Sequence, residues 1–383
     1  MKILQISSAH SFGGGERHLV DLTKGLIERG HNVFAALRPD SSLSERLDGV
    51  NIFTVPLRNS FDIFSASQLK KIIRENEIEI VHAHLGRDYS IASLAVRRTN
   101  AKLIITRHVL FSLNRVHRLA LSNVSRVIAV SKAVEKRLLE KKSFPKEKTR
   151  VVHNGINIES KGEEEKRRWE DGEMGRWGET ALFNKSLPFS SSPHLPISFV
   201  GTVGELKPLK GHEEFIRTAA LLVKKFDNTR FVIVGKDNSK TKEYLRALEK
   251  LCDDLKITKR VHFVGWVENI SAFLQSFDVF VSASRSESFG LAIVEAMANG
   301  VAVVATKTEG AREIIEDNKT GLLVDVGDVE AISNAVESLL KDEVKRKALS
   351  DSARLDAENR FSLKAMIDAT EKVYAETLGT PSS

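Results

Sequence analysis

The sequence predicts an α/β protein built from two domains, each a parallel β-sheet covered by helices. Short β-branched runs alternate with amphipathic helical stretches, and this alternation is typical of βαβ units and parallel sheets. The alternation stops over residues 159–196 and then begins again. Each half opens with a strand, a glycine-bearing loop and a helix, so the two halves amount to an architectural repeat. At 383 residues the chain also exceeds one comfortable hydrophobic core.

The first domain is expected over residues 1–158. Its first helix should bury one face and end just before Gly30, which suits the left-handed position after a helix C-terminus. The apolar residues on that face are Leu19, Leu22, Leu26 and Ile27. Strands are expected over residues 3–7, 32–37, 52–55, 78–82, 103–106, 127–130 and 151–153. Further helices are expected over residues 66–75, 89–98 and 132–142.

The second domain is expected over residues 197–362, after a linker or insert over 159–196. The linker is rich in charge and then in Ser and Pro, which is typical of a flexible segment. We expect the last helix, over residues 363–378, to return to the first domain. Strands are expected over residues 197–203, 230–234, 261–264, 279–281 and 301–305. Helices are expected over residues 213–225, 241–255, 270–277, 328–341 and 343–360.

Composition and charge narrow the class of protein. No apolar run is long enough to span a membrane, and the first residues enter a strand directly, so we expect a cytoplasmic protein without a secretory signal. The single cysteine, Cys252, excludes internal disulfides and a cysteine metal cluster. Residues 1–158 carry 26 Lys and Arg against 14 Asp and Glu, whereas residues 159–383 carry 32 against 37. The basic half indicates an anionic partner, such as the inner face of the cytoplasmic membrane, or simply a solvated basic surface.

The stretch from residue 279 to residue 300 predicts an anion-binding site. A buried strand is followed by a polar loop and then a helix whose start is preceded by Ser288 and Gly290. A helix N-terminus offers backbone N–H groups and the positive end of the helix dipole. Glu287 lies in the loop and Glu295 lies on the helix. Two carboxylates beside an anion site suggest a ligand in which sugar hydroxyls flank a phosphate. The helical apolar positions are Leu291, Val294 and Ala298.

Glycine-bearing loops follow the first strand of each domain. Gly13, Gly14 and Gly15 allow a close approach of the backbone to a ligand, and a tight turn is the plainer interpretation. In the second domain, Lys207 and Lys210 follow such a loop and could supply cations to a diphosphate. Neither loop has the dinucleotide-binding spacing or the P-loop signature, which argues against a NAD-dependent enzyme.

Other polar groups follow strands. The backbone at Val267 could pair with a nucleobase. We expect His82 and His84 to project to opposite faces of a continued strand, which argues against a metal site made by these two histidines. His82 is expected to pack and hydrogen-bond under a loop. His108, beside Arg107, is the better candidate for contacting a substrate.

Taken together, these motifs resemble those of the retaining glycosyltransferases of family 4. The pair Glu287 and Glu295 within ESFGLAIVEAMANG is the most specific motif. It is supported, in order along the chain, by the Gly13–Gly15 loop, VHAH, VSKAVEKRL and HNGIN. The resemblance covers nearly all of the chain except residues 159–196. It implies the GT-B fold, in which two Rossmann-like domains face each other across a cleft.

The resemblance also implies residue roles in binding a nucleotide sugar. Glu295 would accept hydrogen bonds from the ribose hydroxyls, and Glu287 would contact the transferred sugar. The amides around Phe289, Gly290 and Leu291 would hold the diphosphate. Gly14 and Gly15 would lie near the phosphate and the sugar, and His108 matches a family histidine close to the reacting sugar and acceptor.

The diphosphate clamp departs from the family pattern. Lys210 matches the family lysine that pairs with the diphosphate, but Glu205 stands where the family usually has arginine. Either Lys207 substitutes for that arginine or the clamp depends on Lys210 alone. No Asp-x-Asp motif occurs in the sequence, and GT-B enzymes typically need no bound metal.

The implied reaction is retaining transfer from a UDP- or GDP-linked sugar to a glycan or a lipid-linked, lipopolysaccharide-type acceptor, without a metal or other cofactor. A sugar-nucleotide epimerase or hydrolase of the same fold is the main alternative, because it would use the same donor without an acceptor. An isoelectric point near 9.3 raises the remote alternative of a nucleic-acid-binding protein. The sequence has no interleaved basic and aromatic stripe, so we expect no nucleic-acid partner.

Overall fold

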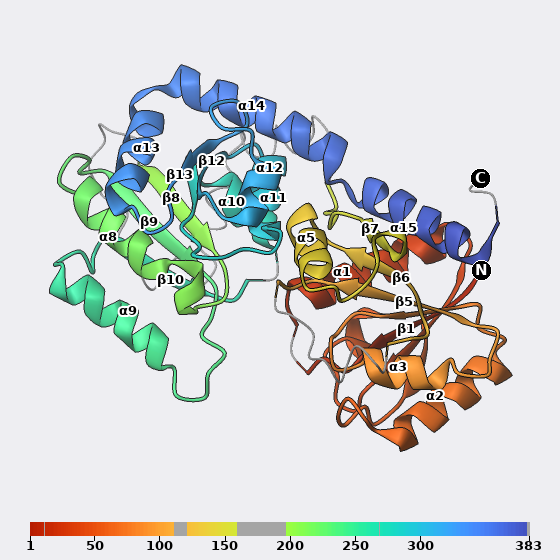
Figure 1. Ribbon diagram of the computed structural model, residues 1–383. Helices are drawn as coiled ribbons and strands as arrows, with labels where there is room; N and C mark the ends of the chain where they lie inside the picture. The colour runs from red at the N-terminus through yellow and green to blue at the C-terminus, as the bar shows by residue number, and fades with distance from the viewer. Residues whose placement is uncertain (11, 111–120, 159–196, 268, 381–383) are drawn as a thin grey trace. The chain divides into compact units, whose positions relative to one another are not determined.

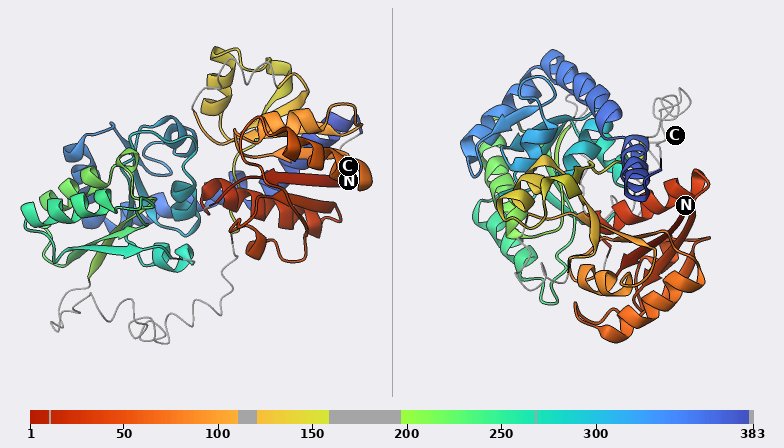
Figure 2. Two further views of the ribbon diagram at one scale, coloured as in Figure 1. Left: turned by 90° about the horizontal axis from the view of Figure 1, so that it is seen from below. Right: turned by 45° about the vertical axis from the view of Figure 1, so that its right-hand side comes forward.

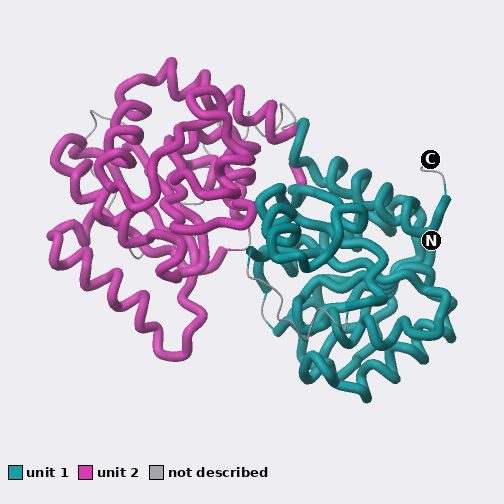
Figure 3. Tube along the Cα trace, viewed as in Figure 1, with its two compact units in different colours: residues 1–156, 359–383 teal, residues 157–358 magenta. Residues whose placement is uncertain are grey.

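The structure is a computed structural model that describes residues 1–10, 12–110, 121–158, 197–267 and 269–380. It divides into two compact units (Figure 3), residues 1–156 with 359–383 (unit 1) and residues 157–358 (unit 2). The predicted boundaries are at residues 158, 197 and 362, and the predicted linker over 159–196 lies outside the described residues. The helix over 363–378, assigned to the first domain by the prediction, belongs to unit 1.

Unit 1 contains a parallel sheet of seven strands in the order β3-β2-β1-β4-β5-β6-β7. The strands are β1 (Lys2–Ser7), β2 (Asn32–Leu37), β3 (Asn51–Thr54), β4 (Ile80–Ala83), β5 (Lys102–Arg107), β6 (Val124–Ala129) and β7 (Thr149–Val151). The helices are α1 (Gly14–Glu28), α2 (Ile63–Glu75), α3 (Tyr89–Ala95), α5 (Lys132–Glu140) and α15 (Leu363–Leu378), with short 3₁₀ turns η1 (Ser44–Arg46) and η2 (Lys146–Lys148).

The C-terminal helix completes the core of unit 1. In α15, Ile367 and Tyr374 join Leu22 and Leu26 of α1 in one hydrophobic cluster on the sheet. Helices α2 and α3 lie on the opposite face of the sheet (Figure 1). The segment that leads into α15 is held against the segment after β7 by a backbone hydrogen bond, in which Ile156 N–H donates to the Phe361 carbonyl at 2.9 Å.

Unit 2 contains a parallel sheet of six strands in the order β10-β9-β8-β11-β12-β13. The strands are β8 (Ser198–Val203), β9 (Thr229–Val234), β10 (Val261–Gly265), β11 (Val279–Ser282), β12 (Ala302–Thr306) and β13 (Leu322–Val324). The helical elements are η3 (Pro208–Lys210), α8 (His212–Leu222), α9 (Glu243–Asp254), α10 (Ile270–Gln275), α11 (Leu291–Ala298), α12 (Glu309–Ile314), α13 (Val329–Lys341) and α14 (Glu343–Arg360).

Helices cover both faces of the sheet in unit 2. Apolar residues of α8, α9 and α13 form one cluster with the strands. Helices α10, α11 and α12 lie together on the other face (Figures 1 and 2). Within the described ranges, none of the helices is both long enough and apolar enough to cross a bilayer.

Most predicted strands and helices are found within a few residues of their expected bounds, and the differences have local causes. The third helix ends at Ala95 rather than at residue 98, and Arg98 takes a left-handed conformation with φ of 60°. Ile27 is 39% exposed instead of buried, because it lies beside the apolar stripe that ends at Leu26. Strand β13 was not among the predicted strands. The prediction for Gly30 is confirmed by its φ of 82° after α1.

Both sheets reverse their strand order at one place. In unit 1 the chain order reverses between β1 and β4, and in unit 2 it reverses between β8 and β11. Ligands of doubly wound α/β proteins bind beyond the carboxyl ends of the strands at such a switch point. The topology therefore places a candidate ligand-binding edge in each unit, and we call these the unit 1 edge (His18, His84 and His108 with Gly15) and the unit 2 edge (Lys210, Glu287 and the start of α11).

Candidate active site

At the unit 2 edge, the loops after β8 and β11 pack backbone against backbone. Gly211 ends the η3 turn with φ of 69°, and a Cβ there would lie 1.9 Å from the Ala283 carbonyl oxygen. Arg285 N–H donates to the Leu209 carbonyl at 2.9 Å. Only glycine permits both this left-handed turn and this close approach. The tight contact brings Lys210, just before Gly211, next to the loop that carries Glu287.

Lys210 and Glu287 form an ion pair at this switch point. The Lys210 Nζ atom lies 2.6 Å from Glu287 Oε2, and the Ser284 hydroxyl donates to the same oxygen at 3.5 Å. The side chains are 31% and 17% exposed, so both remain accessible from solvent. The methylene groups of Lys210 lie against Gly204, where a Cβ would be in ordinary contact at 3.6 Å. The structure thus brings together two residues that the sequence assigned to one site.

Helix α11 begins at this ion pair. Gly290 is its N-cap with φ of 109°, and no side chain caps the helix. Helix α12 holds the loop that precedes α11, because Gly310 N–H on α12 donates to the Glu287 carbonyl at 3.0 Å. A Cβ at Gly310 would lie 2.3 Å from the Phe289 carbonyl oxygen. Because the helix provides no side-chain cap, the first-turn N–H groups are the part of α11 suited to an anion.

Glu295 is buried on α11, at 8% exposure, among apolar neighbours in the chain. Of the three apolar positions noted at helical spacing, Val294 is buried, whereas Leu291 and Ala298 are only half-buried. The short helix is surrounded more completely than its amphipathic pattern suggests, since residues 293–297 are all buried. Phe289 is buried in the preceding loop, and Val267 is half-buried after β10.

The position of the expected family arginine holds a second ion pair. Glu205 Oε2 lies 2.6 Å from Lys207 Nζ, and Glu205 Oε1 accepts a hydrogen bond from Asn238 Nδ2 at 2.9 Å. The positive charge of Lys207 is therefore balanced by Glu205. The His212 ring donates from Nε2 to the Glu205 carbonyl at 3.2 Å, and burial lowers the pKa of His212 to about 4.

Sequence reasoning missed a third ion pair near the unit 2 edge. Arg285, in the same loop as Glu287, lies 2.7 Å from Glu214 of α8. The hydrogen bond to Glu214 raises the pKa of Arg285. The position of Arg285 in the polar loop after β11 was the one sequence feature that could have pointed to it. Local spacing could not reveal its partner, Glu214 on α8.

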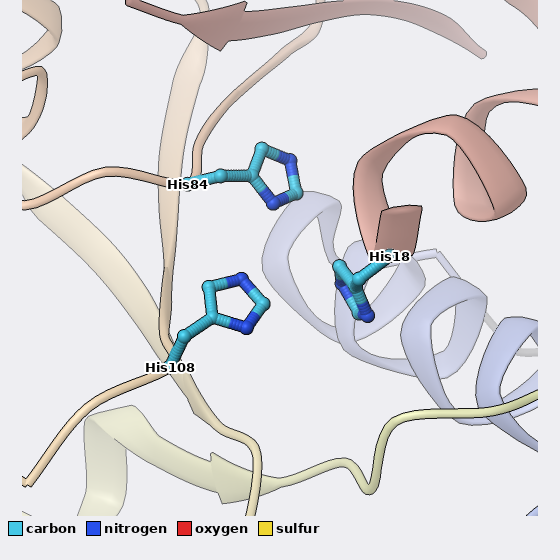
Figure 4. A group of neighbouring side chains, drawn as sticks. All are labelled: His18, His84 and His108. Atoms are coloured by element: carbon cyan, nitrogen blue, oxygen red, sulfur yellow. The ribbon is translucent and has the colours of Figure 1, made fainter. Parts of the chain in front are cut away.

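The unit 1 edge gathers histidines instead of ion pairs. His18 lies on α1, His84 directly follows β4 and His108 directly follows β5. Each can offer one ring nitrogen to a group whose atoms all lie within 4.8 Å of one another. Figure 4 shows the three rings pointing toward one another. The sequence singled out His84 and His108 but not His18, which lies on a helix far away in the chain.

The prediction that His82 and His84 face opposite ways is wrong. Their ring centroids lie 4.2 Å apart, because residues two apart on a strand project to the same face. His82 is fully buried, and its two ring nitrogens share hydrogen bonds of 2.7 Å with Tyr374 and Thr106. This confirms the packing role predicted for His82.

Desolvation favours the neutral form of the neighbouring imidazoles of unit 1, of which His108 is half-buried and the others are buried. Burial lowers the pKa of His18 to about 4 and that of His82 to about 3. Burial also places the pKa values of His84 and His108 well below their ordinary value. A neutral ring can accept a hydrogen bond or ligate a metal ion through one nitrogen.

The glycine loop meets this cluster. Gly13 is the N-cap of α1, so Gly14 and Gly15 form the first turn of the helix. A Cβ on Gly15 would lie 3.9 Å from ring carbons of His108. The structure thus brings together Gly15 and His108, which the sequence assigned to one site. The predicted residues Gly14, Gly15 and His108 all belong to unit 1, and the remaining predicted residues belong to unit 2.

Models of two glycosyltransferase families match the chain. The model described as Glycosyltransferase Family 4 matches residues 12–160, and the model described as Glycosyl transferases group 1 matches residues 192–356. These matches lie on the two α/β units and define a glycosyltransferase with the GT-B fold. The chain belongs to glycosyltransferase family 4, which confirms the resemblance found in the sequence.

Relatives and solved structures agree with this assignment. The chain is 26% identical over 386 residues to an uncharacterized glycosyltransferase of Methanocaldococcus jannaschii, with 94% of each chain covered. It is 25% identical over 390 residues to N-acetyl-alpha-D-glucosaminyl L-malate synthase of Bacillus anthracis, covering 96% of this chain and 95% of the relative. A glycosyltransferase structure from Rickettsia africae superposes with a TM-score of 0.83 at 23% identity, with 99% of each chain covered. Anabaena HepE in complex with UDP-glucose has a TM-score of 0.79 at 23% identity, again with 99% of each chain covered.

Proposed function

We propose that this protein transfers a sugar from a nucleoside-diphosphate sugar to a glycan or lipid-linked acceptor, with retention at the anomeric carbon and without a metal ion at the diphosphate. The observation that carries the proposal is the Lys210–Glu287 ion pair at the switch point of unit 2, beside the uncapped start of α11. A cation, a helix N-terminus and a carboxylate together suit a diphosphate joined to a sugar.

The proposed binding exchanges one partner of Lys210 for another. On donor binding, the Lys210 ammonium pairs with the diphosphate, and the Glu287 carboxylate accepts hydrogen bonds from hydroxyls of the transferred sugar. Both side chains are partly exposed, so breaking their mutual ion pair costs little, about 0–1 kcal/mol. The amides at Phe289, Gly290 and Leu291 hold phosphate oxygens, and Glu295 accepts from the ribose diol.

In the proposed reaction, the bond from the anomeric carbon to the diphosphate oxygen breaks as the acceptor oxygen forms its bond on the same face. The acceptor hydroxyl proton passes to the departing diphosphate oxygen. Lys210 and the α11 amides stabilise the charge that develops on this leaving group. Within unit 1, His108, with Gly15 beside it, is the residue for which we propose a contact with a sugar.

The nature of the donor and acceptor is supported by related proteins. The Anabaena HepE structures contain UDP or UDP-glucose, which supports a UDP-linked donor. A lipopolysaccharide core biosynthesis glycosyltransferase of Rhizobium meliloti is 38% identical over 128 residues, which cover 33% of this chain. With the basic first half, this match supports a lipopolysaccharide-type acceptor and peripheral contact with an anionic membrane on the cytoplasmic side. Absence of co-sedimentation with anionic vesicles at low salt would contradict the membrane contact.

The test is a screen of nucleotide sugars for thermal stabilisation and nucleotide release, followed by a panel of acceptors and determination of the anomeric configuration of the product. Lys210→Ala and Glu295→Ala should abolish transfer with the fold intact. Lys319→Ala is the matched control, because Lys319 pairs with Glu316 elsewhere in unit 2 at 2.9 Å. Wild-type turnover in the first two variants would refute the donor site. Conversion of the sugar nucleotide without an acceptor would instead favour an epimerase or hydrolase.

A further inference from the structure

We propose that His18, His84 and His108 form a binding site for one divalent transition-metal ion of the zinc type. The three side chains come from α1 and from the ends of β4 and β5, and each offers a ring nitrogen to the group. His108 is also the residue proposed to contact a sugar, whereas His18 and His84 have no role in the function proposed above. The site belongs entirely to unit 1, whereas the residues proposed to hold the diphosphate belong to unit 2.

The spacing of the nitrogens suits an ion after a small adjustment. The ligand atoms all lie within 4.8 Å of one another. A point equidistant from three atoms at this largest spacing lies about 2.8 Å from each, and a zinc–imidazole bond is about 2.0–2.1 Å long. Each ring nitrogen therefore needs to move by about 0.7 Å or less, which side-chain rotation can supply.

The polar atoms of the cluster support the same conclusion. His18 Nδ1, His84 Nδ1 and His108 Nε2 are buried and make no hydrogen bond within the protein. Buried polar atoms are usually paired, so an unpaired nitrogen on each of three neighbouring rings calls for a ligand. Asn154 Oδ1 is also buried without a hydrogen-bond partner. It could accept a hydrogen bond from a metal-bound water.

The His84 ring is held by a hydrogen bond of the kind that orients metal-ligating histidines. His84 Nε2 lies 2.8 Å from Gln5 Oε1, and Gln5 is fully buried on β1. Because this oxygen can only accept, His84 donates from Nε2 and presents Nδ1 as a lone pair. A ligating histidine typically donates its other N–H to a carbonyl or carboxylate in this way.

The type of ion follows from the ligands. The group consists of imidazoles, which suit zinc, cobalt, nickel and copper, whereas magnesium and calcium prefer oxygen ligands. Three histidines leave a coordination position for water or an exogenous ligand. The proposal shares His108 with the proposed sugar transfer, so its test measures metal binding without a sugar nucleotide and uses variants of His18 and His84, which have no role in that transfer.

The test is titration of the full-length, metal-stripped protein with Co²⁺, followed by visible absorption spectroscopy, with Zn²⁺ displacement followed by calorimetry. We expect one ion per chain and the visible bands of low-symmetry Co²⁺, which Zn²⁺ abolishes and Mg²⁺ leaves unchanged. His84→Gln and His18→Gln should lose these bands. His262→Gln is the matched control, because His262 also has a buried, unpaired ring nitrogen but lies on β10 in unit 2.

A second variant tests the site without removing a ligand. Gln5→Leu removes the acceptor of the His84 N–H and should weaken metal binding by roughly 10- to 100-fold while retaining the bands at saturation. Circular dichroism of the metal-free variants verifies that each has folded. Absence of Co²⁺ bands in the folded wild-type protein, or equal affinity in the wild type and His84→Gln, would overturn the proposal.

Discussion

The unit 1 edge and the unit 2 edge lie where the strand order of each sheet reverses, and the two sheets share the order of six strands, with a seventh strand in unit 1. The side chains at the two edges nevertheless differ in chemistry. The unit 2 edge is charged and internally paired through Lys210–Glu287, with Lys207–Glu205 in the loop beside it. The unit 1 edge consists of neutral imidazoles, several of which retain an unpaired buried nitrogen. A shared backbone arrangement therefore positions a ligand site without determining what the site binds.

The difference has an energetic consequence. Partly exposed ion pairs exchange partners at little cost, so the unit 2 edge is suited to a charged ligand that binds and leaves. Each unpaired buried nitrogen instead lowers the stability of the folded protein by its desolvation free energy, which a bound ligand would offset. The predictions below test this contrast at single residues, from the largest expected effect to the smallest.

Gly310→Ala should disrupt the unit 2 edge most strongly. The added Cβ would lie 2.3 Å from the Phe289 carbonyl oxygen, and ordinary contact begins at 3.4 Å. The loop carrying Glu287 must then move by about 1 Å, a displacement that can cost about 100-fold in rate. We also expect unfolding to become easier by about 1–3 kcal/mol from overpacking. Steady-state kinetics and chemical denaturation measure the two effects.

Gly204→Ala is the control for this substitution. A Cβ at Gly204 would meet the methylene groups of Lys210 at 3.6 Å, which is ordinary contact at the same edge. We expect near-normal activity from Gly204→Ala. Equal activity of the two variants would show that the Gly310 contact does not position the loop.

Acid should destabilise unit 2 through protonation of His212. Burial lowers the pKa of His212 from 6.5 to about 4, so the unfolded chain binds the proton more readily than the native protein does. The stability that depends on neutral His212 is complete above pH 6.5 and is lost as the pH falls toward 4. The full loss is about 3 kcal/mol by proton linkage.

The groups around the His212 ring are a backbone carbonyl and two charged side chains. The Glu205 carbonyl accepts its Nε2–H, and the charges of Lys210 and Glu214 act on the ring with opposite signs. Its Nδ1 is buried without a partner. Denaturation at a series of pH values should give a smaller decline between pH 6.5 and 4 for His212→Gln than for the wild type. Parallel curves would exclude this histidine as the cause.

Tyr374→Phe should destabilise unit 1 by about 1–3 kcal/mol, because it leaves a buried nitrogen of His82 without its partner. Tyr244→Phe in unit 2 is the matched control. The Tyr244 hydroxyl lies buried with no hydrogen-bond partner, so its removal should leave the stability unchanged or slightly raised. Equilibrium denaturation compares the two, and an equal cost for both would contradict the paired role of Tyr374.

Local pattern was enough to predict most of the strands, the glycine loops and the start of α11 after Gly290. Such features depend on residues close together in the sequence, as Gly290 and Glu287 are. The cluster of His18, His84 and His108 depends instead on the order of strands in the sheet, because α1, β4 and β5 meet only after folding. A correct strand periodicity would have placed His82 and His84 on one face, but nothing local indicates His18.

The ion pairs could not be predicted from the sequence either. The sequence placed Glu205, Lys207 and Lys210 in one loop, but it could not reveal which carboxylate each lysine meets. Lys210 reaches Glu287 because Gly211 lets two loops touch, and a contact between residues 77 positions apart leaves no periodic signature. Packing between distant loops determines which cations remain available to a ligand.

Glu205→Arg sharpens that last point and should have the smallest effect. The substitution supplies the arginine expected from the family pattern and releases Lys207 from its 2.6 Å ion pair, so two more cations could face the proposed diphosphate. We expect KM for the donor to fall by about threefold to tenfold, roughly 1 kcal/mol, with little change in kcat. Glu316→Arg is the matched control, because Glu316 also pairs with a lysine in unit 2 and its substitution makes the same change in charge. An equal fall in KM in both variants would indicate a general charge effect, and an unchanged KM for Glu205→Arg would show that this loop does not face the donor phosphates.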